Sequence, residues 1–499
     1  MTRIAFTSLL FFIFLCTGVR AQVTPRTLPF RVDDAVRFSM TQPIGSARFA
    51  GTGGSMTAIG VDGATLHTNP AGIGWNRFSA AQITPGFSLA GVDAQLRGNP
   101  GNGPTQENTG NFIVPNASLI WAGDTRSVNW STFNFGISYT RLADLNETIV
   151  YEGRSEGSII QAVAEDLNDG VSDPTRAGLA ISIPGTLIPD GDFFTTDFDV
   201  PENAGAQIFR SGRVARTGNI SELALGFGGN YKEKVLWGFT LGIPSINFTE
   251  TKVYNEVDDQ GEVTFYDDAG FDETLEMTGS GVNFKFGLIG RPTDQLRISA
   301  AVHSPTLWTI DETFFTDFEY NYTDAGQALG GTAESDLFVE SINLATPWRF
   351  FLGGGYLIGN NGFISVDADY SNFAGNQFSS DDFAQVNDAA NEDIDLALTS
   401  SIGVRLGGEL NLKPFQVRAG VGYRTQPYVD QRNGEDTALL NYSAGAGYSI
   451  GKFFIDVAAR LEGNNTYYAP YRTFNFDGQV VDTERTRITG MLTVGFRGF

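Results

Sequence analysis

Few side chains in this sequence could carry out acid–base or nucleophilic chemistry. The 499 residues include two histidines, His67 and His303, and a single cysteine, Cys16. No pattern resembles a nucleophile with its base, and no cluster of side chains has the spacing of metal ligands. We therefore predict no catalytic residue, no metal site, no cofactor and no enzyme activity. His303, in the sequence AAVHSPT, is expected to face the interior of the fold near a strand.

Three arginines in the C-terminal part of the chain are candidates for ligand binding. Arg405, Arg418 and Arg424 fall on the polar side of segments in which polar and apolar residues alternate. A guanidinium binds a carboxylate through two parallel hydrogen bonds, so these arginines could guide the head group of a fatty-acid-like ligand. The alternative, which we favour, is that they pair with acids such as Glu409 and hold another segment in place.

The elements that position these arginines are predicted to be β-strands. Apolar and polar or small residues alternate with period two in segment after segment, including VLWGFTLGI (235–243), PFQVRAGVGYR (414–424) and LLNYSAGAGYSI (439–450). A soluble β-sandwich also alternates, but it seldom places so many aromatic residues beside glycine. A transmembrane barrel turns the apolar face of each strand to lipid and the polar face to the lumen.

Composition and loop lengths support a transmembrane barrel. The chain has 60 Gly, 40 Phe and 16 Tyr with only 18% charged residues, and no later apolar run is long enough for a membrane helix. Its net charge of −24 argues against nucleic acid as a partner and fits acidic surface loops. Short turns alternate with long polar loops between about 14 strands, as in bacterial barrels. We therefore predict an all-β, antiparallel transmembrane β-barrel with both chain ends in the periplasm.

Two of the predicted outer loops contain structure of their own. Residues 153–216 are the largest loop, and GSIIQAVAEDLNDG (157–170) has the spacing of a short amphipathic helix. That helix either packs on the rim of the barrel or offers an apolar landing surface to an oily ligand. Residues 335–344 resemble a strand, but we assign them to an outer loop at 312–347 because an extra strand would break the alternation of loops.

The N-terminal part divides into a signal peptide and a plug. Residues 1–21 have a basic start, a short apolar run and small residues before Gln22, as in a secretory signal peptide. Residues 22–77 are rich in glycine and small residues and show little alternation. We expect them to fold back into the lumen as a hatch, which leaves residues 78–499 for the barrel.

A turn sequence lies at the end of this expected hatch. Asn69, Pro70, Ala71 and Gly72 combine a residue that bonds its own backbone, a fixed φ and a flexible glycine. We expect the turn to sit where the plug joins the first strand, with Gly72 letting the backbone pass close to the wall. The turn is needed either for folding alone or also to hold the plug in its closed position.

The N-terminal segment DDAVRFSMTQPIGSARFAGTGGSMTAIGVDGATLHTNPAGIG resembles the hatch of the long-chain fatty-acid transporter (FadL) family, in its Bacteroidetes-like form. The later pieces FGISYTRLADLNETIVYEG, ATPWRFFLGGGYLIG, FQVRAGVGYRTQPY and MLTVGFRGF are also similar to this family. The resemblance implies a 14-stranded outer-membrane barrel that passes hydrophobic molecules through a hatch-blocked lumen and a side opening in the wall.

The C-terminus departs from the usual pattern of outer-membrane strands. Ile488, Leu492, Val494 and Phe496 share one face, whereas the terminal Phe499 falls on the other. We still expect Phe499 to act as the signal for the outer-membrane barrel assembly machinery.

We predict a monomeric channel in the bacterial outer membrane for passive uptake of hydrophobic or amphipathic small molecules, such as long-chain fatty acids. Its expected partners are the lipid bilayer and the substrate. Two alternatives are a secretion-associated or structural barrel, as some Bacteroidetes-like relatives are, and a general porin. A stable complex with secreted proteins would indicate the first alternative, and a continuous open lumen would indicate the second.

Overall fold

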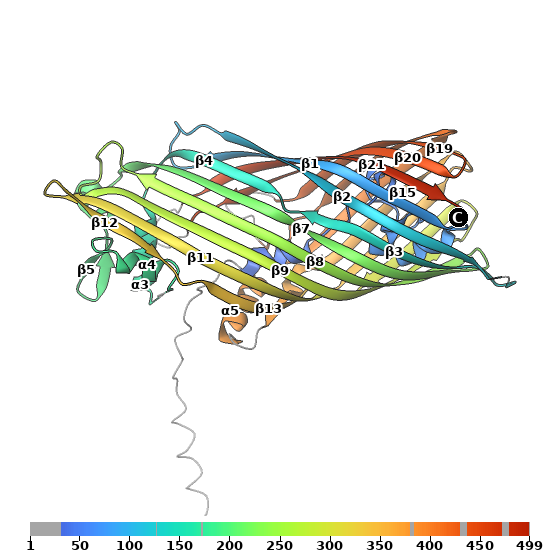
Figure 1. Cartoon of the computed structure of the whole chain (residues 1–499), viewed down its shortest axis with the longest axis horizontal. Coiled ribbons are helices and arrows are strands. Elements are labelled where there is room, and N and C mark those ends of the chain that lie inside the picture. The colour runs from blue at the N-terminus through green and yellow to red at the C-terminus, as the bar shows by residue number, and fades with distance from the viewer. Residues whose placement is uncertain are drawn as a thin grey trace, which may run out of the picture.

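The computed structural model describes residues 31–125, 127–170, 173–379, 384–429, 437–471 and 479–498. Their strands form an antiparallel sheet that closes into a long barrel (Figure 1). The first strand, β1 (Ala80–Leu96), pairs with the last, β21 (Val481–Arg497), so every strand of the wall has a partner on each side. The predicted signal peptide, residues 22–30 of the predicted hatch and Phe499 lie outside the described residues.

The wall consists of 14 staves, by which we mean either one strand or two strands that follow each other in line along the wall. The staves follow one another in chain order. Most staves are single strands: β1, β2 (Thr105–Asp124), β7 (Gln207–Tyr231), β8 (Val235–Val257), β9 (Tyr266–Gly290), β17 (Ser400–Leu412), β18 (Phe415–Arg424), β19 (Leu439–Ile450), β20 (Phe453–Tyr468) and β21. The others are interrupted strands: β3 (Trp130–Asp144) with β4 (Glu147–Glu156), β10 (Leu296–His303) with β11 (Leu307–Asp324), β13 (Phe338–Ala345) with β14 (Arg349–Leu357), and β15 (Gly362–Asn372) with β16 (Gln377–Ser379).

The prediction of an outer loop at 312–347 is wrong. Strand β11 continues to Asp324, and the chain returns through β12 (Gln327–Glu334) and β13, both of which pair with β11. Residues 335–344 therefore belong largely to the wall. Pro347 interrupts the sequence pattern because proline cannot donate to a strand ladder, so the stave of β13 and β14 looked like a strand that began only after Pro347. The total stays at 14 because β13 continues into β14 within one stave.

The largest loop is shorter than predicted, because β4 ends at Glu156 and β7 begins at Gln207. It contains the expected amphipathic helix, α3 (Ile159–Asn168). It also contains a second helix, α4 (Ala177–Ser182), and a small hairpin of β5 (Ile188–Asp190) and β6 (Phe193–Thr195). Short 3-10 turns, η3 (Asp197–Asp199) and η4 (Pro201–Asn203), complete it. Helix α5 (Ala384–Ala397) and η5 (Phe373–Gly375) lie between β15 and β17.

The outer surface of the barrel carries an apolar belt near the short turns. The side chains of Phe415, Val417 and Tyr442 are 56%, 43% and 52% exposed, whereas the alternate residues Arg418 and Arg424 are buried inside. Oily side chains therefore point outward and charged ones inward, the reverse of a soluble fold. At the short-turn end of the belt Trp130 packs edge-on against Tyr231, with ring centroids 5.1 Å apart, as in the aromatic girdle of a membrane barrel.

Beyond this belt the outward-facing residues become charged. On β9 the exposed Phe284, Phe286 and Leu288 are followed toward the long-loop end by the exposed Glu276. The barrel is therefore of the membrane-spanning type, and its long-loop half extends past the apolar layer. No helix among the described residues is long and apolar enough to cross a membrane.

The interior is occupied by the N-terminal part of the chain. It forms α1 (Arg31–Ser39), α2 (Ala47–Gly51) and two 3-10 turns, η1 (Gly63–His67) and η2 (Pro70–Trp75), before β1 begins. These elements are drawn in blue within the barrel in Figure 1. Their side chains are almost all buried, although the three segments between them contain no helix or strand.

The outward register of β18 leads to a first prediction. Val421 is exposed in the apolar belt, so an arginine there would place a charge in lipid and cost about 2 to 4 kcal/mol near the membrane centre. We expect Val421→Arg to lower the fraction of heat-resistant folded barrel on a gel, with Val421→Ala as the control. Equal assembly of the two variants would show that the assigned register is wrong.

Candidate functional site

Residues 31–76, which we call the plug, contact all 14 staves of the wall. Helix α2 lies against β18 to β21, and η1 and η2 lie against β2, β3, β7, β8 and β9. Side chains of β1, β10, β14, β15 and β17 complete the ring through hydrogen bonds to plug atoms. The plug therefore spans the whole cross-section of the barrel.

Polar side chains of the wall bind the plug backbone from opposite sides. Asn134 of β3 donates to the carbonyl of Ile73 at 2.6 Å, and the Asp367 carboxylate of β15 accepts from the Thr57 amide at 3.0 Å. His303 faces the lumen as expected, and its Nε2 donates to the plug through the Thr68 carbonyl at 2.7 Å. These bonds satisfy backbone groups of an irregular segment that lies at membrane depth.

Glycines of the wall allow the plug backbone to approach closely. A Cβ at Gly287 would lie 1.9 Å from the Oδ1 of Asn69, and a Cβ at Gly238 would lie 2.3 Å from the carbonyl carbon of Pro70. Neither distance is possible for real atoms, so these positions require glycine for the plug to sit where it does. The other wall glycines at which a Cβ would come closer than 3.0 Å to the plug are Gly226, Gly228, Gly353, Gly355, Gly407 and Gly420.

The turn at residues 69–72 is buried and joins the plug to the wall. The Asn69 side chain accepts from the Ala71 amide at 3.1 Å and donates to the Leu288 carbonyl of β9 at 3.3 Å. Pro70 begins η2, where a missing N–H costs nothing. The reason expected for a glycine at position 72 is wrong, because a Cβ there would meet atoms of the plug itself, at Gly60 and Thr65, rather than atoms of the wall.

The structure places Arg418 in an ion-pair chain that reaches the plug. Its Nε lies 2.7 Å from Glu409, and its Nη1 lies 2.7 Å from Asp456 of β20. The same Glu409 carboxylate binds Arg48 of the plug at 2.8 Å. Removing one member of such a buried network leaves the others without a partner, which typically costs about 3 to 5 kcal/mol.

Arg405 and Arg424 share the buried carboxylate of Asp369, at 3.1 Å and 2.6 Å. Arg349 lies 3.6 Å from the same carboxylate and donates to the plug at the Thr41 carbonyl. A ligand carboxylate would have to displace Asp369 to reach either predicted arginine. This geometry favours a structural role for both over head-group guidance.

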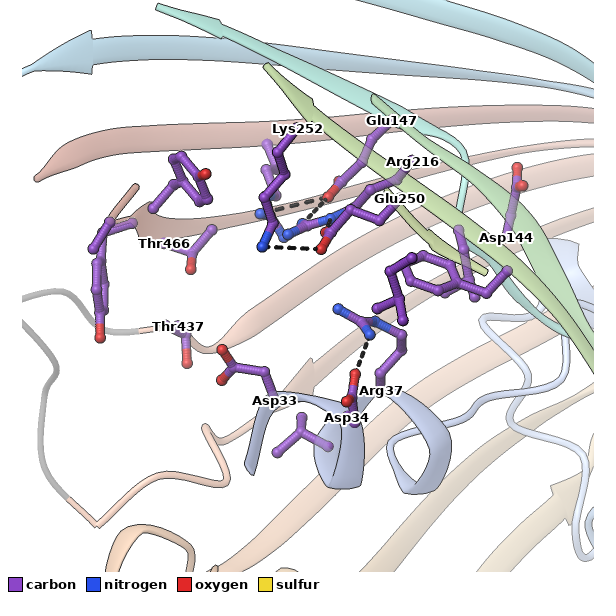
Figure 2. A pocket seen from close by; sticks show the side chains of 18 of the residues that line it. Asp33, Asp34, Arg37, Asp144, Glu147, Arg216, Glu250, Lys252, Thr437 and Thr466 are labelled. Atoms are coloured by element: carbon purple, nitrogen blue, oxygen red, sulfur yellow. Dashed lines mark hydrogen bonds and ion pairs between the residues drawn. The ribbon is translucent and has the colours of Figure 1, made fainter. Parts of the chain in front are cut away.

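A chamber lies between helix α1 of the plug and the long-loop half of the wall (Figure 2). Its volume is about 370 Å³. Charged residues of both signs line it: Asp33, Asp34, Arg37, Asp144, Glu147, Arg216, Glu250, Lys252, Arg485 and Arg487. The rest of the lining includes apolar side chains such as Phe248 and Leu275 and hydroxyl groups such as those of Thr437 and Thr466. These residues come from segments distant in sequence, so alternation alone did not single them out as a group.

Most charges in the chamber are paired with one another. Arg216 binds both Glu250 and Glu147, and its Nη1 lies 2.7 Å from Glu147. Arg487 donates to Asp144 at 3.0 Å. Helix α1 contributes the pair Arg37 and Asp34, so the plug forms part of the chamber floor.

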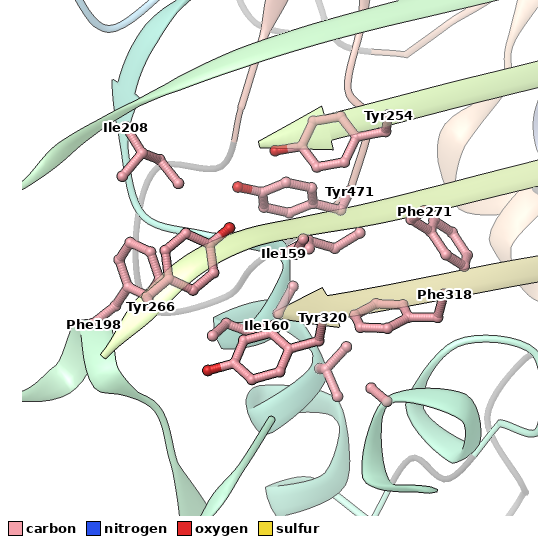
Figure 3. Packing of buried hydrophobic residues seen from close by; sticks show 14 of the residues in the cluster. Ile159, Ile160, Phe198, Ile208, Tyr254, Tyr266, Phe271, Phe318, Tyr320 and Tyr471 are labelled. Atoms are coloured by element: carbon pink, nitrogen blue, oxygen red, sulfur yellow. The ribbon is translucent and has the colours of Figure 1, made fainter. Parts of the chain in front are cut away.

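An apolar cluster lies at the long-loop end of the barrel (Figure 3). Ile159 and Ile160 of α3 are fully buried against aromatic residues of the wall, including Tyr254, Tyr266 and Tyr320. The apolar face of α3 therefore packs inside the mouth of the barrel, and the alternative of a landing surface on that face is wrong.

A buried polar group anchors the first turn of α3. Glu256 of β8 accepts hydrogen bonds from the hydroxyl groups of Tyr254 at 2.6 Å and Tyr266 at 3.0 Å, and from the Ile159 amide at 3.3 Å. Arg210 is fully buried, lies 3.5 Å from the Glu256 carboxylate and donates to the Tyr254 hydroxyl at 3.0 Å. A carboxylate at a helix N-terminus also stabilises the exposed amides there.

The spacing G-x-S-x-G, which presents a nucleophilic serine in some hydrolases, occurs at Gly153–Gly157 and at Gly447–Gly451. Ser449 lies within β19, and Ser155 lies within β4, which ends at Glu156 shortly before helix α3 begins. Ser155 is hydrogen-bonded to Arg210 and Gln479. The two histidines of the chain are bonded elsewhere, so neither serine has a base beside it.

Comparison with known proteins gives matches in structure. No protein-family model matches the chain, and no curated protein matches it in sequence. A FadL homologue of Pseudomonas aeruginosa is 14% identical, with 91% of this chain and 98% of that chain covered at a TM-score of 0.53. The Pseudomonas putida toluene transporter TodX is 10% identical, with 91% and 98% covered and a TM-score of 0.52. The deltaS2 mutant of TodX, a monoaromatic hydrocarbon channel, is 11% identical with the same coverage and a TM-score of 0.52.

The fold and lumen define this chain as a plugged, membrane-spanning β-barrel of the outer-membrane type. Its fold is that of the FadL homologue and of TodX over nearly the whole of those chains.

The close seating of the plug leads to a second prediction. We expect Gly238→Val to push η2 off the wall, because the added side chain would overlap the backbone at Pro70. The barrel should still assemble, and liposomes that contain it should release a trapped small polar solute several-fold faster than with the wild type.

Gly490→Val is the matched control for this experiment. Gly490 lies on the outer face, and a Cβ there would meet no atom within 4 Å. If assembled Gly238→Val barrels retain the solute as well as the control does, the close contact between Gly238 and the plug is not what keeps the lumen closed.

Proposed function

We propose that this protein is an outer-membrane channel for passive uptake of hydrophobic or amphipathic small molecules. The observation that carries the proposal is a plug that contacts every stave at the level of the barrel wall. A porin needs a continuous aqueous lumen, which such a plug obstructs. A molecule soluble in lipid can instead leave through the wall, so a closed lumen does not prevent its uptake.

The likeness in fold supports the same substrate class. The neighbours are a FadL homologue, a toluene transporter and a monoaromatic hydrocarbon channel. We propose long-chain fatty acids and other amphiphiles as substrates of this chain. Because the barrel, plug and chamber all come from one chain, we propose that it acts as a monomer. We further propose that the barrel assembly machinery recognises its last strand and Phe499.

The wall contains a weak seam through which a substrate could leave. We define the proline seam as the wall around Pro244 of β8, Pro305 between β10 and β11, and Pro347 between β13 and β14. The pairs His303 with Arg349 and Leu307 with Ala345 place Pro305 opposite Pro347. Neither proline can donate to the ladder, so the two staves are held less firmly here.

The seam lies beside the plug. A small cavity behind it is lined by Phe38 and Thr41 of the plug and by Pro244, Trp308 and Pro347 of the wall. Between the two staves the ladder is bridged by one residue pair: the Thr346 amide donates to the Thr306 carbonyl at 3.0 Å, and the Thr306 amide donates to the Thr346 hydroxyl at 2.9 Å. We propose that the seam opens to release the substrate into the membrane when the plug shifts.

The two alternative functions are a general porin and a secretion-associated or structural barrel. A general porin is disfavoured by the plug. No feature of the described residues favours a secretion-associated barrel. The cavities found beside the plug and the loop at 157–206 are a chamber of about 370 Å³ and smaller ones.

Cross-linking across the seam gives a third prediction. The chain has a single cysteine, Cys16, within the predicted signal peptide, so a pair introduced at Thr306→Cys and Thr346→Cys would have no other thiol to join in the mature protein. We expect oxidation of this variant to reduce fatty-acid uptake by reconstituted liposomes to the level of protein-free liposomes. Uptake should return when a reductant breaks the disulfide.

The matched control carries Asp311→Cys and Ser341→Cys, which pair directly on the same two staves above the seam. Oxidation of the control should leave uptake unchanged. If the oxidised seam variant takes up fatty acid as fast as its reduced form, the substrate does not leave through this seam.

A further inference from the structure

The outer surface of the wall has a hollow within the apolar belt, over strands β8, β9, β10, β14 and β15. Its volume is about 660 Å³. Ile298 of β10 stands there between two glycines, because its partners on either side are Gly290 and Gly354. Elsewhere in the belt large side chains are direct neighbours, as Leu406 and Val421 are on β17 and β18. The small residues that line the hollow are Gly290, Ala300, Gly354 and Ala368.

The wall is thin at this hollow because neighbouring glycines of β14 face opposite ways. A Cβ at Gly353 would lie 2.0 Å from Thr57 of the plug, and a Cβ at Gly355 would lie 2.6 Å from Ile59. Gly354, between them, lines the hollow on the membrane side. The plug and the hollow are therefore separated by backbone alone. An empty space outside such a wall loses dispersion contacts that an acyl chain can supply.

Positive charge gathers at the short-turn end of the barrel, next to the hollow. The short turns and the segment before β1 include the cations Arg77, Lys232, Lys234, Arg291, Lys413 and Lys452. The carboxylates in the described parts of the same segments are those of Asp124, Glu233 and Asp294. The whole chain has a net charge of −24, so the sign of the charge is reversed at this end. A basic surface at the edge of a membrane attracts anionic lipid head groups.

Lys234 is the cation placed to hold such a head group. It is exposed and directly precedes Val235, which lines the hollow. Within the described residues its ammonium group makes no ion pair, because the neighbouring Glu233 binds Arg77 at 2.9 Å. Lys232, in the same turn, lies over the ring of Tyr231 in the aromatic girdle, 5.3 Å from the ring centroid. This turn therefore lies at the level where the apolar belt ends and lipid head groups begin.

We propose that the hollow binds an acyl chain of an anionic phospholipid from the leaflet that meets the short turns, with the lipid phosphate on Lys234. The bound chain lies against the outside of β14, and the inner face of the same strand seats the plug. A phosphatidylcholine of equal chain length suits the site less well, because its head group adds a positive charge beside the basic turns. Farther along the wall the outward residues Glu276 and Asp311 are acidic and repel a phosphate.

The test uses native mass spectrometry of the full-length mature barrel, freed of lipid in detergent, to count the lipids that it retains. Dioleoyl phosphatidylglycerol and dioleoyl phosphatidylcholine share their acyl chains and are titrated separately. We expect the first phosphatidylglycerol to bind at least about fivefold more tightly than the first phosphatidylcholine, because one lysine near an anionic head group contributes about that factor. Lys234→Gln should remove most of this preference.

Gly354→Leu tests the hollow itself. A Cβ at Gly354 would meet only Val366, at an ordinary contact distance of 3.7 Å, so we expect the variant to fold. Its leucine side chain should occupy the hollow and weaken binding of the first phosphatidylglycerol at least about fivefold. Heat resistance of the folded barrel on a gel checks that each variant has assembled.

Lys413→Gln and Gly490→Leu are the matched controls. Lys413 lies in the turn between β17 and β18, and Gly490 faces outward on β21, both away from the hollow. Both variants should bind the two lipids like the wild type. The proposal is overturned if the wild type binds the two lipids equally, or if folded Gly354→Leu binds phosphatidylglycerol as tightly as Gly490→Leu does. A dimer that appears in the wild-type spectra and is lost in Gly354→Leu would also overturn it, because a second copy would then fill the hollow.

Discussion

The fit between the plug backbone and the wall glycines is the constraint on which the rest of the structure depends. An irregular segment inside a membrane barrel must have its backbone groups bonded by protein, because lipid offers none. Glycines such as Gly238 and Gly287 bring the wall close enough to η2 for the Asn69 side chain to bond the Leu288 carbonyl. The plug can then contact every stave, and the lumen beside it is reduced to separate cavities.

Charge inside the barrel is divided between holding the plug and lining the chamber. The ion pairs that link Arg48, Glu409 and Arg418 bind the plug to the wall, so these charged groups are already paired with one another. Above the plug, charges of both signs pair across the chamber, where Arg216 binds both Glu147 and Glu250. The proline seam, which we propose as the exit for a substrate, lies beside the same plug.

Alternation in the sequence predicted the barrel well, because lipid outside and polar groups inside act on every strand in the same way. It placed Arg405, Arg418 and Arg424 in the lumen and named Glu409 as a partner, but not Asp369 or Asp456, since pairing across staves depends on register. The false loop at 312–347 came from the rule that short and long loops alternate, and Pro347 hid the continuation of β13 into β14. The chamber was missed because Asp33, Glu147, Glu250 and Arg485 meet only after the barrel closes around the plug.

The most direct test of this account is the electrical conductance of the intact barrel in a planar lipid bilayer, compared with a variant that lacks residues 31–76. The account predicts that the intact protein stays close to the conductance of the bare bilayer, because the plug contacts every stave. The shortened barrel should show the steady conductance of an open pore. A steady open-pore conductance from the intact protein would contradict the claim that the plug closes the lumen.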